Sequence, residues 1–325
     1  MTKGTLERIA RRVGAAWALT GCLLLATPAW GQAPIRLVVP VAAGGTLDAM
    51  ARTLAIQASQ VLNETVIVEN RPGAGGLIGT EYVARSKPDG RTLLLSTSFV
   101  ATNVVTTRGA PDPRVDLKPV ILLSGAEVYL VVNPAHGIHG AGDLQATARK
   151  LPGGLNCGGA TGQLTFSCER LRELLGEEAV TTIPYPGAAQ AMNALVAGQV
   201  DLVFAPRGVM AALAEAGRVR PLALASDSKA TPPFDRLPQL KATWADWATP
   251  NHTGLLVAGE TPRPVIERLN GVFNSVLLKP EVRQAMLQYG YQPVLGGEPG
   301  ELSAALKAEI DYYTRIAARL GMKPQ

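Results

Sequence analysis

The sequence is poor in the residues on which most enzyme mechanisms depend. Its 325 residues include only three histidines and three cysteines, and aromatic residues make up 5% of the chain. A G-x-S-x-G nucleophile elbow, an H-E-x-x-H zinc motif and a G-x-x-x-x-G-K-S/T phosphate loop are all missing. We therefore expect a protein without catalytic residues, metal or cofactor, and we keep a hydrolytic enzyme as the weakest alternative.

Phosphate-bearing partners are not expected either. The glycine-rich segment 73–79 lacks the G-x-G-x-x-G spacing of a dinucleotide site, because Ile78 stands where the last glycine is required. No basic run interleaved with aromatic residues occurs, which argues against nucleic acid as a partner. Four basic residues and one acidic residue lie in segment 1–31, so the net charge of +5 falls to +2 without it.

The N-terminal segment has the pattern of an export signal. Basic residues precede an apolar run over 13–30, which ends in small residues. We expect cleavage after Gly31, so that residues 1–31 are a signal peptide and a periplasmic protein starts at Gln32. Two alternatives remain: a retained membrane anchor, and a lipoprotein anchored at Cys22.

Removal of the signal leaves two cysteines, Cys157 and Cys168. An even pair in an oxidising compartment is the setting in which disulfides form and persist, although two free thiols remain the alternative. A bridge between them would close a loop of about 12 residues and contribute about 2 to 3 kcal/mol to stability by loop-entropy arguments.

Short apolar, β-branched runs alternate with helical patterns in two series. This alternation predicts parallel sheets with helices on their faces. The first series begins at residue 35 and the second at residue 155, and the helical patterns after residue 264 are expected to cover the first sheet. We predict an α/β protein with two lobes, each a mainly parallel sheet flanked by helices: lobe 1 from 32–133 plus 254–325, and lobe 2 from 134–253. The two crossing strands would serve as a hinge.

The loop after the first predicted strand is the first candidate for binding. It joins that strand to a helix, so its glycines leave backbone N–H groups free at the positive end of the helix, where an anion fits. Asp48, in the first helical turn, either caps the helix or contacts the ligand. The candidates here are Ala42, Ala43, Gly44, Gly45, Thr46 and Asp48.

Two loops of the second lobe repeat this arrangement. One spans 156–163 and the other 184–188, and each follows a predicted strand and precedes a helix. Ligands in open α/β sheets bind outside the carboxyl ends of the strands, where these loops are expected. The candidates are Gly159, Thr161, Gln163, Tyr185, Gly187 and Ala188.

Several segments together resemble a known family. The stretch 69–79 (ENRPGAGGLIG), with 88–90, 184–187, 198–201, 261–264 and 280–283, is similar in order and sequence to motifs of the Bug family, the solute receptors of tripartite tricarboxylate transporters. The resemblance covers nearly the whole chain after the signal. It implies a periplasmic-binding-protein type II fold that closes around a small carboxylate like a Venus flytrap. It also implies that the protein is a monomer and that it delivers the ligand to the transporter's membrane subunits. The alternative partner is a membrane sensor kinase.

The chain departs from the family pattern near the expected site. Val41 and Ala43 stand where the family usually has Phe and Pro, and Ala205 stands where an Asp is expected. Arg207, two residues further on, offers a guanidinium that binds carboxylates bidentately, or else it is a solvated charge at a helix start. The sequence therefore leaves the identity of the ligand open.

Overall fold

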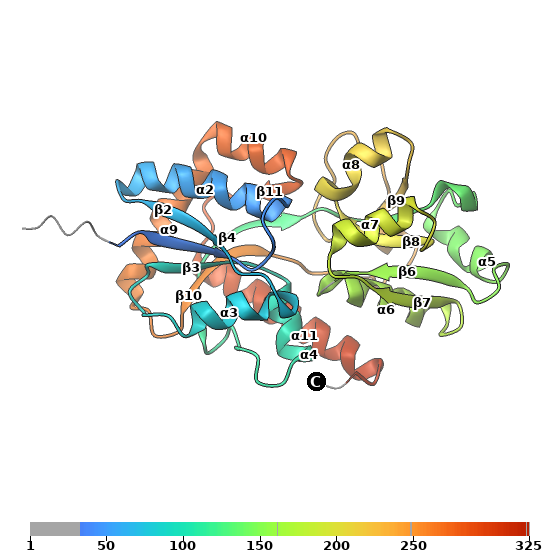
Figure 1. The fold of residues 1–325 in the computed structure, drawn as a ribbon, viewed down its shortest axis with the longest axis horizontal. Coiled ribbons are helices and arrows are strands. Elements are labelled where there is room, and N and C mark those ends of the chain that lie inside the picture. Colours follow the sequence, from blue (N-terminus) through green and yellow to red (C-terminus); the bar gives the residue numbers. More distant parts are fainter. Residues whose placement is uncertain (1–32, 161, 248, 323, 325) are drawn as a thin grey trace, which may run out of the picture. The chain divides into compact units, whose positions relative to one another are not determined.

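The computed structural model describes residues 33–160, 162–247, 249–322 and 324 (Figure 1). The expected signal peptide, its cleavage after Gly31, the lipoprotein cysteine Cys22 and the candidate Thr161 lie outside the described residues. Residues 34–325 form one compact unit that contains two β-sheets among the described residues. We call each sheet with the helices that cover it a lobe.

The first sheet has the spatial order β11-β4-β10-β3-β1-β2 in the described part of the chain. Parallel pairing joins β1 to β2 and to β3, with Leu37 opposite both Val68 and Leu93. The strands are β1 (Ile35–Val39), β2 (Val66–Asn70), β3 (Thr92–Thr97), β4 (Leu117–Ala126), β10 (Thr253–Ala258) and β11 (Tyr291–Pro293).

Helices cover both faces of this sheet (Figure 1). One face packs against α2 (Thr46–Leu62), α9 (Arg263–Leu278) and α10 (Pro280–Gln288). The other packs against α3 (Leu77–Ala84), α4 (Phe99–Thr106) and α11 (Pro299–Arg319), and the short helix η1 (Ala74–Gly76) precedes α3. Helix α2 buries an apolar stripe with helical spacing, as its sequence pattern predicts, and it ends at Asn63 in the left-handed conformation that asparagine tolerates.

The second sheet has the order β7-β6-β8-β5-β9 in the described residues. Its strands are β5 (Val128–Val132), β6 (Leu155–Gly159), β7 (Val180–Pro184), β8 (Leu202–Pro206) and β9 (Arg220–Leu224). Its helices are α5 (Leu144–Ala148), α6 (Gln163–Leu175), α7 (Ala188–Val196) and α8 (Arg207–Glu215), with the short helices η2 (Pro134–His136), η3 (Ala141–Asp143) and η4 (Leu240–Ala242).

The strands that adjoin the crossings make both sheets mixed. β10 is antiparallel to β3 and β4, and β5 is antiparallel to β8 and β9. A strand that carries the chain out of a lobe and one that brings it back run in opposite directions, which accounts for the pairing of β4 with β10. The strands of the βαβ units, β1 to β3 and β6 to β8, keep the expected parallel pairing.

The chain passes from the first sheet to the second at Glu127, between β4 and β5. The predicted boundary at residue 133 assigned β5 to lobe 1, and this assignment was wrong, because β5 lies between β8 and β9. The apolar sequence of a strand predicts that the strand is buried, but it does not predict the sheet to which the strand belongs. The chain returns with β10, which begins at Thr253, one residue before the predicted return. The predicted lobe division is otherwise untested and stays a prediction.

Of the two alternatives for the cysteines, the structure contains the bridge. A disulfide joins Cys157 in β6 to Cys168 in α6, with 5.8 Å between the two Cα atoms. Both residues are fully buried in the core of lobe 2. The bridge therefore ties together the two ends of the strand–loop–helix segment that contains the predicted binding residues Gly159 and Gln163.

Candidate ligand-binding site

The loop between β1 and α2 presents an open helix N-terminus. Residues 42–45 are exposed, and Gly45 is the N-cap of α2 without any side-chain capping bond. The first N–H groups of a helix lack intrahelical partners and carry the positive end of the helix dipole. The loop thus leads into a helix N-terminus, as its glycines predicted.

Asp48 holds this loop in place. One carboxylate oxygen accepts from the Gly44 backbone N–H (3.0 Å) and from Arg52 Nε (3.0 Å), and the other accepts from Asn70 Nδ2 (2.9 Å) and Arg52 Nη2 (3.1 Å). Burial raises the pKa of Asp48, but the bonds from Arg52, Gly44 and Asn70 together lower it below its ordinary value. Both oxygens are engaged with protein groups, which favours the structural role over ligand contact.

We expect Asp48→Ala to lower the free energy of unfolding by about 1 to 3 kcal/mol, because it removes the hydrogen bonds that the buried carboxylate accepts from Gly44, Arg52 and Asn70. A carboxylate with a lowered folded-state pKa contributes stability above its unfolded pKa, and that stability is lost as pH falls through the folded pKa. The difference between Asp48→Ala and wild type in urea denaturation should therefore be largest near pH 7 and shrink toward pH 2. Asp311→Ala, which removes an exposed ion pair with Lys307, is the control. Equal stability of Asp48→Ala and wild type at pH 7 would refute the role of Asp48.

Thr46 lies where the two lobes meet. A β-carbon added at Gly208, the second residue of α8, would clash with the Thr46 methyl group. The N-terminus of α8 in lobe 2 therefore packs directly against the N-terminus of α2 in lobe 1. Tyr291 of β11, a buried residue in lobe 1, lies beside the Thr46 side chain.

A second contact between the lobes lies beside the loop that follows β6. Gly162, the N-cap of α6, approaches Phe99 and Thr102 of α4 in lobe 1. Further along the same helix, the Phe166 ring lies 4.9 Å from that of Tyr313 in α11, centroid to centroid. The loops after β1 and after β6 thus both lie at carboxyl ends of strands and next to contacts between the lobes.

The loop after β6 carries an unpaired donor. Gln163 begins α6, and within the part of the chain that the structure describes its buried Nε2 has no hydrogen-bond partner. Gly159, the last residue of β6, is buried, and a β-carbon there would lie 2.8 Å from the Thr182 methyl carbon. The Thr182 hydroxyl is likewise buried and unpaired among the described residues. Buried polar groups are rarely left without partners, so both groups are candidates for ligand or water contact.

The third predicted loop is joined to the second. The Tyr185 backbone N–H donates to the Gly159 carbonyl oxygen (2.8 Å). Gly187 is the N-cap of α7, which begins at Ala188, and it again makes no side-chain capping bond. The structure therefore brings Gly159, Tyr185, Gly187 and Ala188 to one end of the second sheet, as the sequence predicts.

Two predicted site residues have other roles. Ala205 is completely buried in the apolar core of lobe 2, where it lies opposite Tyr129 in the sheet. The Arg207 guanidinium donates to the carbonyl oxygens of Leu287 (2.8 Å) and Pro232 (2.9 Å). These bonds use two of the five N–H groups of the guanidinium. Arg207 is thus not a solvated charge, and its contact with a ligand stays a prediction.

A buried network at the second crossing was not predicted from the sequence. His252 Nε2 lies 2.8 Å from Ser96 Oγ in β3, and His252 Nδ1 lies 2.7 Å from Glu309 Oε1 in α11. Serine, histidine and a carboxylate in this order resemble a catalytic triad, but all three are at most 1% exposed, so a substrate has no access to the serine. The other two histidines pair elsewhere: His136 with Asp201 (2.7 Å), and His139 with Arg220 (3.3 Å).

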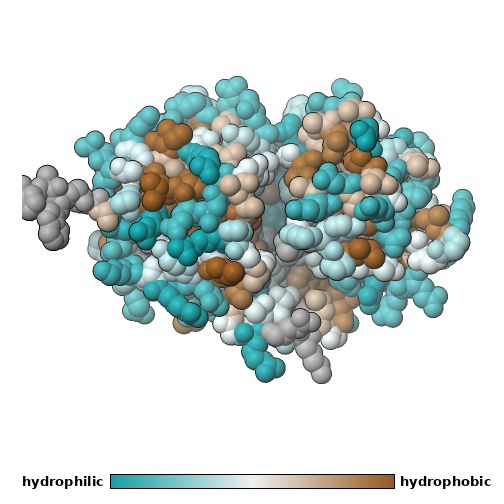
Figure 2. Space-filling model, viewed as in Figure 1, coloured by the Kyte–Doolittle hydropathy of each residue, from teal (hydrophilic) through white to brown (hydrophobic). Residues whose placement is uncertain are grey.

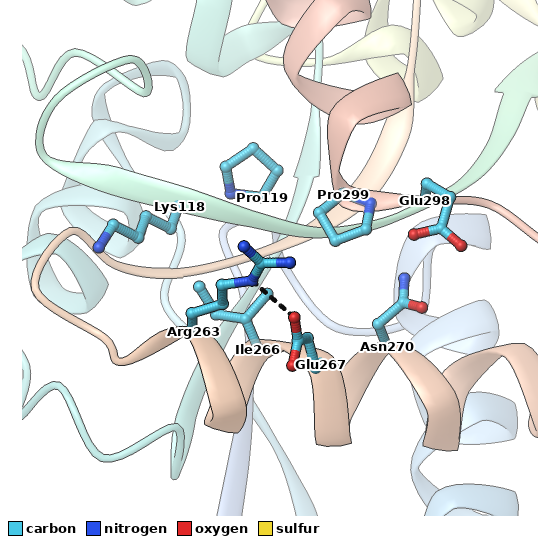
Figure 3. Close-up of a pocket in the computed structure, with 8 residues that line it drawn as sticks. All are labelled: Lys118, Pro119, Arg263, Ile266, Glu267, Asn270, Glu298 and Pro299. Atoms are coloured by element: carbon cyan, nitrogen blue, oxygen red, sulfur yellow. Dashed lines mark hydrogen bonds and ion pairs between the residues drawn. The ribbon is translucent and has the colours of Figure 1, made fainter.

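A pocket of about 470 Å³ lies on lobe 1 away from these loops (Figure 3). It is formed by the start of β4, the first half of α9 and the start of α11, and an Arg263–Glu267 ion pair (2.6 Å) runs along its α9 side. None of the predicted site residues lines it. Its wall carries Lys118 and Arg263 but also Glu267 and Glu298, so its charges nearly balance and do not select an anion.

The surface in Figure 2 is mostly hydrophilic or weakly polar, with hydrophobic residues in small separate groups. Among the described residues, no helix combines the length and the apolar character needed to cross a membrane.

A family model described as the tripartite tricarboxylate transporter family receptor matches residues 50–316. A UPF0065 protein from Pseudomonas sp. strain P51 is 31% identical over 300 residues, which cover 89% of this chain and 86% of that protein. Protein BugT of Bordetella pertussis is 29% identical over 298 residues, which cover 89% of this chain and 90% of BugT.

Solved structures of similar proteins share the fold. Rpa4515 of R. palustris, solved with adipate, superposes with a TM-score of 0.81 at 28% identity and covers 91% of this chain and 100% of that one. MatC (Rpa3494) from Rhodopseudomonas palustris, with bound malate, has a TM-score of 0.78 at 26% identity and covers 87% of this chain and 98% of that one. These likenesses confirm the two-lobed periplasmic-binding-protein fold, and the family match confirms the expectation of a receptor. The chain belongs to the Bug family of tripartite tricarboxylate transporter receptors.

Proposed function

We propose that this chain is a periplasmic receptor that binds a small carboxylate between its two lobes and delivers it to the membrane subunits of a tripartite tricarboxylate transporter. One observation carries the proposal. Three helices, α2, α6 and α7, each begin after a glycine, which has no side chain with which to cap the first N–H groups, at the carboxyl ends of β1, β6 and β7. Open helix N-termini of this kind bind anions through backbone N–H groups.

The comparisons support a carboxylate as the ligand. Two similar structures were solved with adipate and with malate, which both carry two carboxylates, although they differ in chain length and in malate's hydroxyl group. Backbone N–H groups bind the carboxylate of a ligand but make few contacts with the rest of the molecule. A site of this kind accounts for related proteins with different ligands.

Thermal-shift screening of residues 32–325 tests the proposal. The panel includes adipate, malate and other small di- and tricarboxylates, each beside its uncharged amide. A ligand that binds only the folded state raises the melting temperature, by an amount that grows with its concentration relative to Kd. We expect a rise of several degrees with at least one acid and none with the matching amide. A panel in which no acid shifts the melting temperature, or in which amides shift it equally, would overturn the carboxylate assignment.

Gln163 is the side chain that we expect to contact the ligand directly. Its buried Nε2, which has no partner among the described residues, gains one when a carboxylate binds. Gln163→Leu should therefore weaken the affinity for the best acid of the panel about tenfold or more, as loss of a hydrogen bond to a charged group does. Gln145→Leu, an exposed substitution in α5, is the matched control and should change nothing. Unchanged affinity in Gln163→Leu would remove this residue from the site.

Membrane delivery has its own test. A tagged protein, loaded with the acid found by screening and cross-linked in cells of its source, should recover membrane permease subunits. Recovery of a sensor kinase instead would show a signalling receptor with the same ligand chemistry.

A further inference from the structure

The Arg207 side chain connects the two lobes. Arg207 is the first residue of α8 in lobe 2, whereas the Leu287 carbonyl that accepts its Nη1–H lies in α10 of lobe 1. Its side chain is only 14% exposed. It packs against Gly290, where an added β-carbon would come within 2.8 Å of the Arg207 β-carbon. The contact between the lobes therefore depends on the close packing of Arg207 against Gly290 as well as on hydrogen bonds.

The Leu287 carbonyl is a good partner for a cation. It belongs to the last turn of α10, where carbonyl groups lack intrahelical donors and carry the negative end of the helix dipole. It accepts one bond from the Gly290 backbone N–H (3.1 Å), and its second lone pair receives the guanidinium. Hydrogen bonds with a charged donor are stronger than neutral ones, so this contact stabilises the observed approach of the lobes.

A second partner for Arg207 lies at the first crossing. Glu127 is 1% exposed, and its carboxylate accepts from the hydroxyls of Tyr129 (2.6 Å) and Thr231 (2.6 Å). Arg207 Nε is buried and unpaired among the described residues, and it stops 4.0 Å from Glu127 Oε2, too far for a hydrogen bond. Besides its bond to the Pro232 carbonyl in lobe 2, the guanidinium thus has one partner in lobe 1 and one at the crossing, and of these two it hydrogen-bonds only the first in this structure.

We propose that Arg207 is a positioning residue that sets the balance between closed and open lobes. With the lobes in contact, Arg207 donates a hydrogen bond to the Leu287 carbonyl and makes none to the Glu127 carboxylate. When the lobes separate, the bond to Leu287 breaks and the guanidinium moves onto the Glu127 carboxylate. Such an exchange between two discrete partners is what makes a hinge bistable. The inference rests on the lobe motion of the proposed function, but it does not depend on which ligand binds.

Pulsed EPR on ligand-free protein tests this latch. Spin labels at cysteines introduced for the exposed Ile56 in α2 and Glu215 in α8 report the distance between the lobes, with the native disulfide left intact. Arg207→Ala should raise the ratio of open to closed molecules about tenfold, as expected for the loss of a charged hydrogen bond from one state. Arg207→Lys, which keeps the charge but not the planar fork, should fall between Ala and wild type.

Two further variants make the test decisive. Arg218→Ala removes an exposed arginine just beyond the end of α8 and should leave the distance distribution unchanged. Glu127→Gln keeps the size of the side chain but weakens the open-state partner, so it should shift molecules toward the short distance. A distribution that Arg207→Ala leaves unchanged, or that Glu127→Gln shifts toward long distances, overturns the latch. A protein that responds as predicted here but binds no carboxylate would instead refute the proposed function alone.

Discussion

Glu309→Ala is expected to lower the free energy of unfolding by about 3 to 5 kcal/mol, the usual cost of removing one partner from a buried pair. The substitution leaves His252 Nδ1 without its 2.7 Å partner in a site where both side chains are at most 1% exposed, and it also leaves a cavity. His252 immediately precedes β10, so the second crossing would lose its attachment to α11. Urea denaturation followed by circular dichroism measures the loss.

Two control variants distinguish the loss of the His252–Glu309 contact from the destabilisation that any substitution in α11 would cause. Glu301→Ala, an exposed substitution in the first turn of the same helix, should cost well under 1 kcal/mol, as exposed substitutions usually do. Glu309→Gln keeps the shape and should cost less than Glu309→Ala. If Glu309→Ala is no less stable than Glu301→Ala, the buried network contributes nothing to the crossing.

The same pair predicts a pH dependence with a defined sign. Burial raises the pKa of Glu309 more than His252 and Ser98 lower it. A group whose folded pKa is raised contributes stability that is present below its unfolded pKa and is lost as pH rises through the folded value. The advantage of wild type over Glu309→Gln, which cannot ionise, should therefore decrease as pH rises above about 4.3, the ordinary carboxyl pKa of glutamate.

Removal of the Cys157–Cys168 bridge is expected to lower the free energy of unfolding by about 3 kcal/mol. The two cysteines are 11 residues apart, and loop-closure entropy for a loop of this size gives that figure. Comparison of oxidised wild type with the Cys157→Ala, Cys168→Ala double variant in urea measures it. Wild type reduced before unfolding should match the double variant.

The bridge also bears on binding. The closed loop contains Gly159 and Gln163, so loss of the bridge should weaken ligand affinity through the cost of ordering this segment. A double variant that is as stable as oxidised wild type, or two free thiols in protein unfolded without reductant, would contradict the role of the bridge.

Local patterns in the sequence predicted the features that depend on neighbours along the chain. Glycines after a strand indicated the starts of α2, α6 and α7, because the sequence signals for a helix N-terminus lie within a few neighbouring residues. The pairing of Cys157 with Cys168 followed from there being only two cysteines after the predicted signal. The order of the family motifs predicted the fold and the receptor class, which the comparisons confirm.

Features that depend on distant partners were not predictable in this way. Arg207 was expected near an anion because of its place after β8, but its acceptors are carbonyl groups 80 and 25 residues away in the sequence. His252 and Glu309 are 57 residues apart, and nothing in the sequence around either marks the other as a partner. Ala205 and strand β5 have apolar patterns that fit either a core or a site wall, and only the pairing of strands decides between them.

Calorimetric titration of residues 32–325 with adipate and malate, each beside its uncharged diamide, tests the central claim most directly. A receptor that closes around a carboxylate should bind adipate, malate or another small carboxylate with one ligand per chain. It should also show a negative heat-capacity change from the surface buried, and no heat of binding with the diamide. Binding of acid and diamide with equal affinity, or no binding of either acid or of any other carboxylate at millimolar concentration, would contradict it.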